Sequence, residues 1–389
     1  MSQFSHTKTL FHLPSNVVYL DGNSLGPMPL AAREHVATMM GNEWGEQMIK
    51  GWNNAGWMSL STQIGDRIAP LIGAEPGHVI MGDTLSIKVH QALAAALALN
   101  PGRKVILSDY GNFPSDLYIA QGLIKTLDRG HTLKTVAPED VSHHIDDQVA
   151  VLMLTEVDYR TGRKHDMQAL TATAHAHGVI TLWDLAHSVG ALPVDLVGSN
   201  VDFAVGCTYK YLNGGPGAPA FIYVCPAYVN KVDSSLSGWL GHAAPFDFEL
   251  DYRAAQGIER LRVGTPPVIA LKCLEPALDI WDLVTIDQVR KQSIALCELF
   301  IREVEARCPG LTLNSPRNAQ ERGSQVSFCF EEGYGVIQAM AERGVIGDFR
   351  APDNMRFGFA PLYIDENDVI TAATLLEEVI SNRLWDQPK

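Results

Sequence analysis

Short apolar runs alternate with segments of helical spacing over the first two thirds of the chain. Apolar, β-branched runs predict buried strands from Val79 and at 104–108, 149–155, 178–183 and 202–206, with a returning strand at 219–224. Between them the pattern predicts helices at 86–99, from 112 onward and at 166–177. Strands that alternate with helices are typical of an α/β fold with a mainly parallel central sheet flanked by helices.

The character of the sequence changes at Ile286. Apolar side chains recur there at helical spacing, and they predict an amphipathic helix through Val289, Ser293, Leu296, Cys297, Phe300 and Val304. Short strands at 311–313, 326–330 and 355–359 follow, which favours a smaller α+β C-terminal domain. Because 389 residues exceed the usual size of one core, we predict an N-terminal segment at 1–55, a large domain at 56–270 and a small domain at 271–389.

Composition and charge exclude several classes of protein. Hydrophobic residues make up 46% and charged residues 19% of the chain, as in a soluble globular protein. A net charge of −14 without a cluster of Lys or Arg argues against nucleic acid and anionic membranes as partners. The longest apolar run, 92–99, is too short to cross a bilayer, and the N-terminus has no basic segment leading into an apolar core. Six cysteines without a C-x-x-C pair favour a reduced chain, so we expect a cytoplasmic protein without disulfides or a metal site.

Asp184 and Lys210 carry the candidate chemistry. Asp184 ends one apolar run and Lys210 follows the next, so in a parallel sheet both side chains would lie at the carboxyl edge, where such folds bind ligands. Pyridoxal phosphate needs this pair, a lysine to hold its aldehyde as a Schiff base and a carboxylate to keep its ring nitrogen protonated. An isolated Asp and Lys would more often be a structural ion pair. The tyrosines on either side of Lys210 and the glycines that follow favour a cofactor site instead.

Further motifs, in order along the chain, resemble those of one family. They are Leu20-Asp-Gly-Asn-Ser-Leu-Gly26, Phe113-Pro-Ser-Asp116, Asp184-Leu-Ala-His187, Thr208-Tyr-Lys-Tyr-Leu-Asn213 and Gly238-Trp-Leu-Gly-His242. Together they resemble bacterial kynureninase, a fold-type-I pyridoxal-phosphate enzyme with the aspartate-aminotransferase fold, from about residue 19 to Tyr363. The resemblance implies a homodimer whose active site is shared between subunits, because in that family the loops that carry Trp239 and Thr265 reach the opposite subunit.

The resemblance also implies roles for single residues. It makes Lys210, Tyr209 and Asp184 catalytic. It places the cofactor against Leu85, Ser86, Phe113, Pro114, Ser115, Asp116, Thr155, Asp184, His187, Tyr209, Lys210, Trp239 and Thr265. It places the substrate against Ser24, Trp52, Thr265 and Arg356, and Arg356 would bind the substrate carboxylate.

The residues alone leave the phosphate site open. The start of the helix at 86–99 offers unpaired N–H groups, so Leu85 and Ser86 could hold a phosphate. Capping of that helix by Asp83 or Thr84 is an equally good interpretation. Only the resemblance favours the phosphate.

Three other positions also have a purely structural interpretation. Trp52 and Trp57 lie in a predicted loop, 51–57, and tryptophans are more often core anchors than ligand contacts. Arg356 lies on a predicted strand, where an arginine is more often a surface charge than a fork for a carboxylate. The resemblance favours ligand roles for Trp52 and Arg356 and leaves Trp57 as packing.

The expected activity is hydrolysis of L-kynurenine to anthranilate and L-alanine, as part of tryptophan catabolism. We expect 3-hydroxykynurenine to be used less well, because Trp52 and Thr265 offer few partners to an added ring hydroxyl.

Two other functions use the same cofactor residues. A cysteine desulfurase needs a nucleophilic cysteine on a mobile loop, whereas Cys308 ends a predicted helix and Cys329 lies within a predicted strand. A non-catalytic pyridoxal-phosphate-binding regulator would keep Lys210 and Asp184, but it has no use for Arg356, Trp52 and Tyr209 together. A kynurenine turnover assay separates these possibilities.

Overall fold

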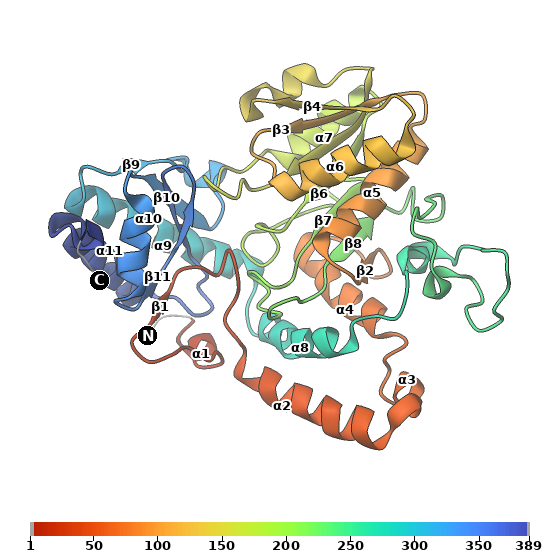
Figure 1. Cartoon of the computed structure of the whole chain (residues 1–389), viewed down its shortest axis with the longest axis horizontal. Coiled ribbons are helices and arrows are strands. Elements are labelled where there is room, and N and C mark those ends of the chain that lie inside the picture. The colour runs from red at the N-terminus through yellow and green to blue at the C-terminus, as the bar shows by residue number, and fades with distance from the viewer. Residues whose placement is uncertain (1–3, 387–389) are drawn as a thin grey trace.

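The computed structural model describes residues 4–386 and consists of two bodies that lie side by side (Figure 1). The larger body is built on a seven-stranded sheet and the smaller on a four-stranded sheet. The predicted domain ends at 1 and 389 lie outside the described residues, as do the first three residues of the N-terminus. The internal domain boundaries at 55 and 270 stay predictions.

The central sheet of the larger body explains the apolar runs. Its strands follow the order β2 (Val79–Met81), β8 (Phe221–Val224), β7 (Phe203–Gly206), β6 (Ile180–Asp184), β5 (Val149–Thr155), β3 (Val105–Asp109) and β4 (Thr132–Val136). The strands from β7 to β4 are parallel, and β8 runs antiparallel to both of its neighbours. Within β6, Leu182 and Trp183 enter different cores on opposite faces. Burial on both faces leaves no polar side to the inner strands.

Helices cover both faces of this sheet. The helices α5 (Leu85–Leu99) and α6 (Pro114–Leu127) share one core with it. The helices α4 (Leu60–Ile68), α7 (Met167–Ala176) and α8 (Val268–Asp279) pack into the other core. The fold class predicted from the sequence is therefore confirmed.

The smaller body combines an antiparallel sheet with helices. The strand order is β12 (Asp348–Arg350), β13 (Asn354–Gly358), β10 (Gln325–Cys329) and β9 (Thr312–Leu313). The helices α9 (Ile286–Arg307), α10 (Gly333–Ala341) and α11 (Glu366–Ser381) pack around it. The long amphipathic helix predicted from Ile286 is thus confirmed, and a capping box formed by Thr285 and Gln288 marks its start.

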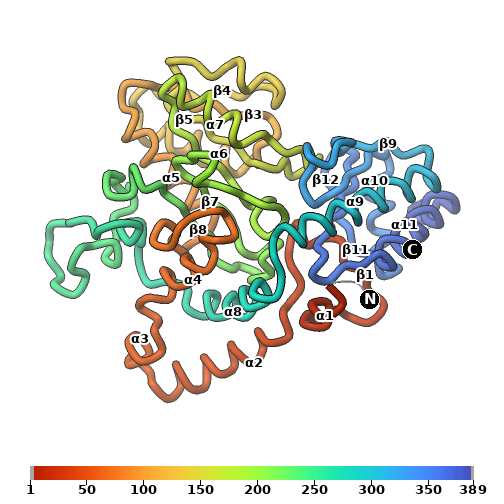
Figure 2. The backbone as a smooth tube through the Cα atoms, turned by 180° about the vertical axis from the view of Figure 1, so that it is seen from behind, coloured from red at the N-terminus to blue at the C-terminus, as the bar shows by residue number. Residues whose placement is uncertain are grey.

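The N-terminal segment is attached to the smaller body. The strand β1 (Val18–Tyr19) pairs in parallel with β11 (Val345–Ile346), and the short helix α1 (Ser5–Lys8) lies nearby (Figure 2). The chain then passes along α2 (Leu30–Thr38) and its π-helical continuation (Met39–Glu46) to reach the larger body. The turn after β1 is therefore held between the two bodies.

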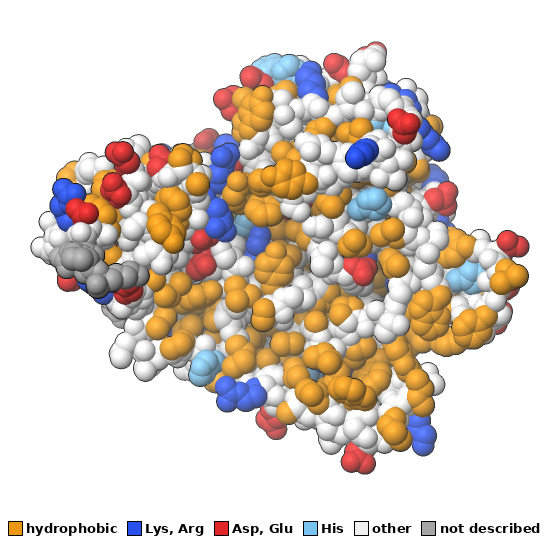
Figure 3. Space-filling model, in the orientation of Figure 1, with side chains coloured by type: hydrophobic (Ala, Val, Ile, Leu, Met, Phe, Trp, Pro, Cys, Tyr) orange, Lys and Arg blue, Asp and Glu red, His pale blue; other side chains and the backbone are white. Residues whose placement is uncertain are grey.

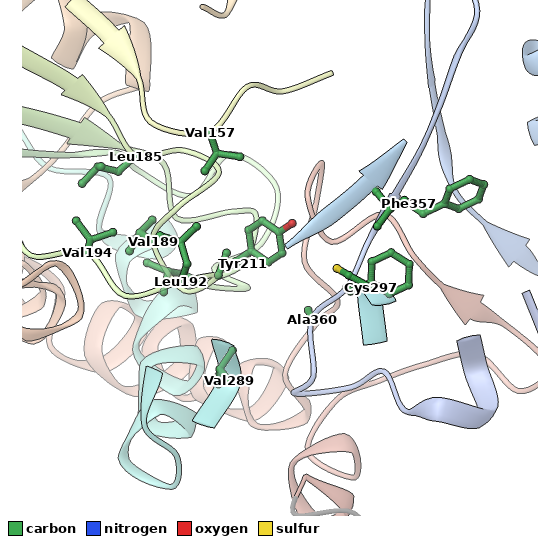
Figure 4. Close-up of a cluster of buried hydrophobic side chains, with 14 of the residues drawn as sticks. Val157, Leu185, Val189, Leu192, Val194, Tyr211, Val289, Cys297, Phe357 and Ala360 are labelled. Atoms are coloured by element: carbon green, nitrogen blue, oxygen red, sulfur yellow. The ribbon is translucent and has the colours of Figure 1, made fainter. Parts of the chain in front are cut away.

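One hydrophobic core continues from the larger body into the smaller one (Figure 4). Val189 and Leu192 enter it from the larger body, and Cys297 and Phe357 from the smaller. Tyr211, one residue after Lys210, belongs to the same core. This shared packing fixes β13 relative to the edge of the central sheet.

The structure corrects one predicted element and adds others. The predicted loop at 51–57 begins with a short helix, α3 (Gly51–Asn54). This helix was not predicted because Gly and Asn both disfavour helix interiors. No strand was predicted at β4, because its alternate side chains are exposed and leave no apolar run. Among residues 4–386, no helix is long and apolar enough to span a membrane.

Candidate active site

Two neighbouring parallel strands bring the predicted acid and amine together. Asp184 is the last residue of β6, and Lys210 follows the end of β7, which pairs with β6 in parallel. Thr155 ends β5 directly beside Asp184 in the register. The carboxyl edge of the sheet thus gathers these side chains, as the sequence predicted.

These side chains line a cavity of about 160 Å³, here called the central cavity. Its wall combines charged, aromatic and small polar groups from both bodies. The lining residues are Asn23, Ser24, Leu85, Phe113, Thr155, Tyr159, Asp184, Ala186, His187, Tyr209, Lys210, Arg350 and Arg356.

Lys210 reaches into the central cavity and contacts His187. The Lys210 Nζ lies 3.0 Å from the His187 Nε2, and that nitrogen lies 3.2 Å from the backbone oxygen of Asn23. Burial, together with the charge of Lys210, holds the pKa of His187 well below its usual range. The imidazole is therefore neutral. The Lys210 Nζ also lies 6.0 Å from the centroid of the Phe113 ring and 5.8 Å from that of the Tyr209 ring.

Asp184 and Asp116 form a buried pair of carboxyl groups. Burial and the neighbouring Asp184 raise the pKa of Asp116 well above its usual range. Burial raises the pKa of Asp184 as well, but the charge of Lys210, the Ala186 N–H at 2.8 Å and Asp116 all act in the opposite direction. Asp116 therefore keeps its proton, and Asp184 is the member of the pair that carries charge.

Two helix N-termini meet near this pair. The Ser86 Oγ, in the first turn of α5, lies 3.1 Å from the Ser115 Oγ, in the first turn of α6. Neither helix has a side-chain cap, so their first N–H groups remain available to an anion. The capping interpretation for Asp83 and Thr84 is wrong, because no side chain caps α5. Pro114 begins α6, where its missing N–H costs nothing.

Arg356 is buried rather than a surface charge. Its side chain is 1% exposed, on β13. The Nη2 donates to the Ser24 Oγ at 2.8 Å and to the Asp348 carboxylate, and the Nη1 donates to the Tyr159 backbone oxygen. The smaller body thus presents a guanidinium group to the same cavity as Lys210.

Seven of the predicted ligand residues do not line the central cavity. Four of them, Ser86, Pro114, Ser115 and Asp116, lie at the starts of α5 and α6, and the other three lie elsewhere. Trp52 packs edge to face on Trp57, with ring centroids 5.9 Å apart. Trp239 is 39% exposed and packs against Phe246. Thr265 lines a separate apolar cavity of about 680 Å³ beside α2 and α8. Their predicted roles in ligand binding stay predictions.

The site also contains residues that the sequence did not predict. Asn23, Tyr159 and Arg350 line the central cavity, and Asp348 holds Arg356. Tyr159 follows β5 closely, so the rule that ligands bind at strand ends could have found it. Arg350 carries no such signal, because β12 is only three residues long.

The fold and the site together define a class of protein. An amine, a buried anionic carboxylate and two uncapped helix N-termini fit the aldehyde, ring nitrogen and phosphate of pyridoxal phosphate. The fold is that of the fold-type-I pyridoxal-phosphate-dependent enzymes.

Similar solved structures include a cysteine desulfurase from Thermococcus onnurineus NA1, with a TM-score of 0.83, 17% identity and coverage of 98% of this chain and 99% of that one. Another is the cystine C-S lyase C-DES in complex with cysteine persulfide, with a TM-score of 0.82, 19% identity and coverage of 96% and 99%.

Relatives of higher identity define the family. The kynureninase of Pseudomonas fluorescens is 48% identical over 97% of this chain and 92% of its own length. The kynureninase of Burkholderia pseudomallei strain 1106a is 47% identical over 97% and 93%. A family model of the kynureninase C-terminal domain matches residues 289–376. The chain belongs to the kynureninase family.

Proposed function

We propose that this chain hydrolyses L-kynurenine to anthranilate and L-alanine with pyridoxal phosphate as its cofactor, and that it serves tryptophan catabolism. The observation that carries the proposal is the convergence of Lys210, Asp184 and Arg356 on one cavity. An amino-acid substrate needs a guanidinium group for its carboxylate, and the cofactor needs the amine and the acid. Family membership supplies the reaction, that of hydrolases acting on carbon–carbon bonds in ketonic substances.

The residues around the cavity divide the work of holding the cofactor. Lys210 would form the covalent link and Asp184 would pair with the ring nitrogen, while protonated Asp116 supports Asp184. Ser86 and Ser115 would bind the phosphate at the two helix N-termini. The other proposed contacts are Leu85, Phe113, Pro114, Thr155, His187 and Tyr209, and Trp239 and Thr265 in a second subunit. When bound, pyridoxal phosphate stabilises negative charge at the substrate Cα.

The chain's own groups would then move the protons. Lys210 is placed to remove the Cα proton, and neutral His187, 3.0 Å away, holds its amine in position without adding charge. Water adds to the γ-carbonyl, the Cβ–Cγ bond breaks, and anthranilate leaves with the new carboxyl group. Tyr209 and Lys210 are placed to return protons to the three-carbon fragment that leaves as L-alanine.

Substrate recognition would use the smaller body and the aromatic segments. Arg356 and Ser24, joined by a hydrogen bond of 2.8 Å, face the same cavity and would bind the carboxylate. Trp52 and Thr265 would enclose the aromatic ring. We also propose that the enzyme works in the cytoplasm, since all six cysteines are free thiols, which a reducing compartment preserves.

A homodimer would bring those segments to the cavity. Large apolar side chains are exposed along the face that runs from α2 to the protruding segment at 239–252 (Figure 3). They are Leu30, Met40, Trp44, Met48, Ile49, Trp239, Phe246, Phe248, Leu250 and Tyr252. Such a surface is typical of a protein interface.

Sedimentation of the purified protein measures its oligomeric state. Shared sites are tested by mixing inactive Lys210→Ala with inactive Trp239→Ala subunits, because hybrid dimers would contain one intact site and regain activity.

The decisive experiment is turnover of L-kynurenine by the purified, cofactor-loaded protein, followed by anthranilate fluorescence. We expect anthranilate and L-alanine in equal amounts. Release of sulfide from L-cysteine would instead favour the desulfurase alternative. The structure gives that alternative little support, because Cys308 is 2% exposed and burial raises its pKa to about 11, so it stays a thiol. Cofactor binding without any turnover would favour the non-catalytic regulator.

A further inference from the structure

A second arginine faces the central cavity beside Arg356. Arg350 and Asp348 lie two residues apart on β12, and therefore on the same face of the strand. Asp348 lies directly opposite Arg356 in the antiparallel register of β12 and β13. Asp348 is thus placed between the two guanidinium groups, and it contacts both.

Arg356 has few free donors left. Its Nη2 donates to both Ser24 and Asp348, and its Nη1 donates to the backbone oxygen of Tyr159. Its Nε is enclosed and has no hydrogen-bond partner among residues 4–386. A carboxylate binds a guanidinium group best through two parallel N–H groups. The two N–H groups that remain, one on Nε and one on Nη1, point in different directions, so Arg356 cannot offer a parallel pair to a ligand without giving up a partner that it already has.

Arg350 has the free edge that Arg356 lacks. Its Nη1 lies 3.0 Å from the Asp348 Oδ1 and its Nη2 lies 2.8 Å from the Asp348 Oδ2, so Asp348 occupies the end of the fork. The only other acceptor that the described residues give it is the Phe349 backbone oxygen, 3.1 Å from Nη1. The Nε–H and the second Nη2–H, which form the side edge of the guanidinium group, remain unused. The side chain is 36% exposed and lines the cavity.

We propose that Arg350 is a second carboxylate-binding residue, so that the substrate carboxylate is held between Arg350 and Arg356 while Asp348 keeps both guanidinium groups in place. The charges support this arrangement. Asp21 and Asp348 place two negative charges beside Arg350 and Arg356. Without Arg350, the substrate carboxylate would approach one positive charge, that of Arg356, next to two negative ones. The inference rests on the proposed function only in that the ligand is an amino acid.

Two ligands that differ only in a carboxylate provide the test. L-Alanine and ethylamine share the amine and the methyl group, so the ratio of their affinities for the cofactor-loaded enzyme, measured by calorimetry, reports recognition of the carboxylate. In Arg350→Gln we expect L-alanine binding to weaken about 10- to 100-fold, and ethylamine binding to change by less than about twofold. Arg350→Lys should be intermediate, because it keeps the charge but not the two parallel N–H groups.

The control is Arg343→Gln. Arg343 is equally exposed, at 35%, but lies after α10 and does not line the central cavity, so neither ligand should respond. Equal weakening of both ligands in Arg350→Gln would indicate a structural role and overturn the inference, as would unchanged binding of L-alanine. If the wild type binds L-alanine but does not turn over L-kynurenine, the proposed function is wrong. The role of Arg350 is still tested in that case, by the ratio of the affinities for L-alanine and ethylamine.

Discussion

The cofactor side and the aromatic side of the proposed site are built in different ways. On the cofactor side, Asp184 and Lys210 follow buried parallel strands and meet within one chain. On the aromatic side, Trp52, Trp239 and Thr265 lie apart from that cavity, on segments beside exposed apolar surface. One chain thus brings together the groups of the cofactor side by itself, whereas enclosure of the substrate ring by Trp52 and Thr265 would need the proposed dimer.

The strongest test of the cofactor side is removal of its amine. Lys210→Ala should abolish both activity and the borohydride-reducible attachment of pyridoxal phosphate, because no other amine lies in the central cavity among residues 4–386. Peptide mapping after reduction locates the link. Lys88 is the informative control, since it is buried and burial lowers its pKa to about 8, yet it faces Asp83 and Gln91 instead of the cavity. A cofactor found on Lys88 would refute the site.

The next test separates the two acids of the buried pair. Asp184→Asn should retain the cofactor and lower kcat about 10- to 100-fold or more, because a neutral amide cannot hold the proton on the ring nitrogen. Asp116→Asn should cost much less, since Asp116 already keeps its proton and an amide resembles that state. Steady-state kinetics and the absorption spectrum measure both variants. Equal losses would mean that the charge is not located on Asp184.

The aromatic side is tested by substrate choice. We expect wild type to prefer L-kynurenine over 3-hydroxykynurenine by about a hundredfold at most, because an apolar pocket rejects an added hydroxyl only weakly. The double variant Trp52→His, Thr265→Asn supplies partners for that hydroxyl and should move kcat/KM toward 3-hydroxykynurenine. Trp57→His is the matched control, since Trp57 is buried beside Trp52. An unchanged ratio in the double variant would remove both residues from specificity.

The smallest expected effect is the contribution of Asp21 to the pH dependence of the free energy of unfolding. Burial, and then Asp348, raise the pKa of Asp21 to about 6, so the folded state binds the Asp21 proton more tightly than the unfolded state. The free energy of unfolding should therefore fall as pH rises from about 4 through 6, by at most about 3 kcal/mol from this group. Asp21→Asn should remove that part of the pH dependence. Urea unfolding at pH 5 and pH 8 measures it, with the exposed Asp233→Asn as control. Equal slopes in Asp21→Asn and wild type would contradict it.

The sequence predicted what depends on local pattern. The central strands, α5, α7 and α9 were predictable because burial on both faces, caps and helical spacing leave marks within a few residues. Asp184 and Lys210 were predictable for the same reason, since each follows an apolar run. Arg350 and Asp348 were not, because their significance depends on strand pairing that brings Asp348 opposite Arg356. In the proposed dimer, the positions of Trp52 and Thr265 relative to the cavity would depend on an interface, which leaves no pattern in the sequence of one chain.

The pairing of β1 with β11 sets the order in which the site can be completed during synthesis. Domains fold as units as they leave the ribosome, N-terminal parts first. Asp184 and Lys210 can take their places once the larger body has emerged. The turn that carries Asn23 and Ser24 has to wait, because β1 finds its partner only when Val345 and Ile346 appear near the far end of the chain. Of these site residues, Arg356 is synthesised last. A nascent chain that stops before β11 would therefore contain the proposed cofactor-binding residues, but not the wall of Ser24 and Arg356 that is proposed to bind the substrate carboxylate.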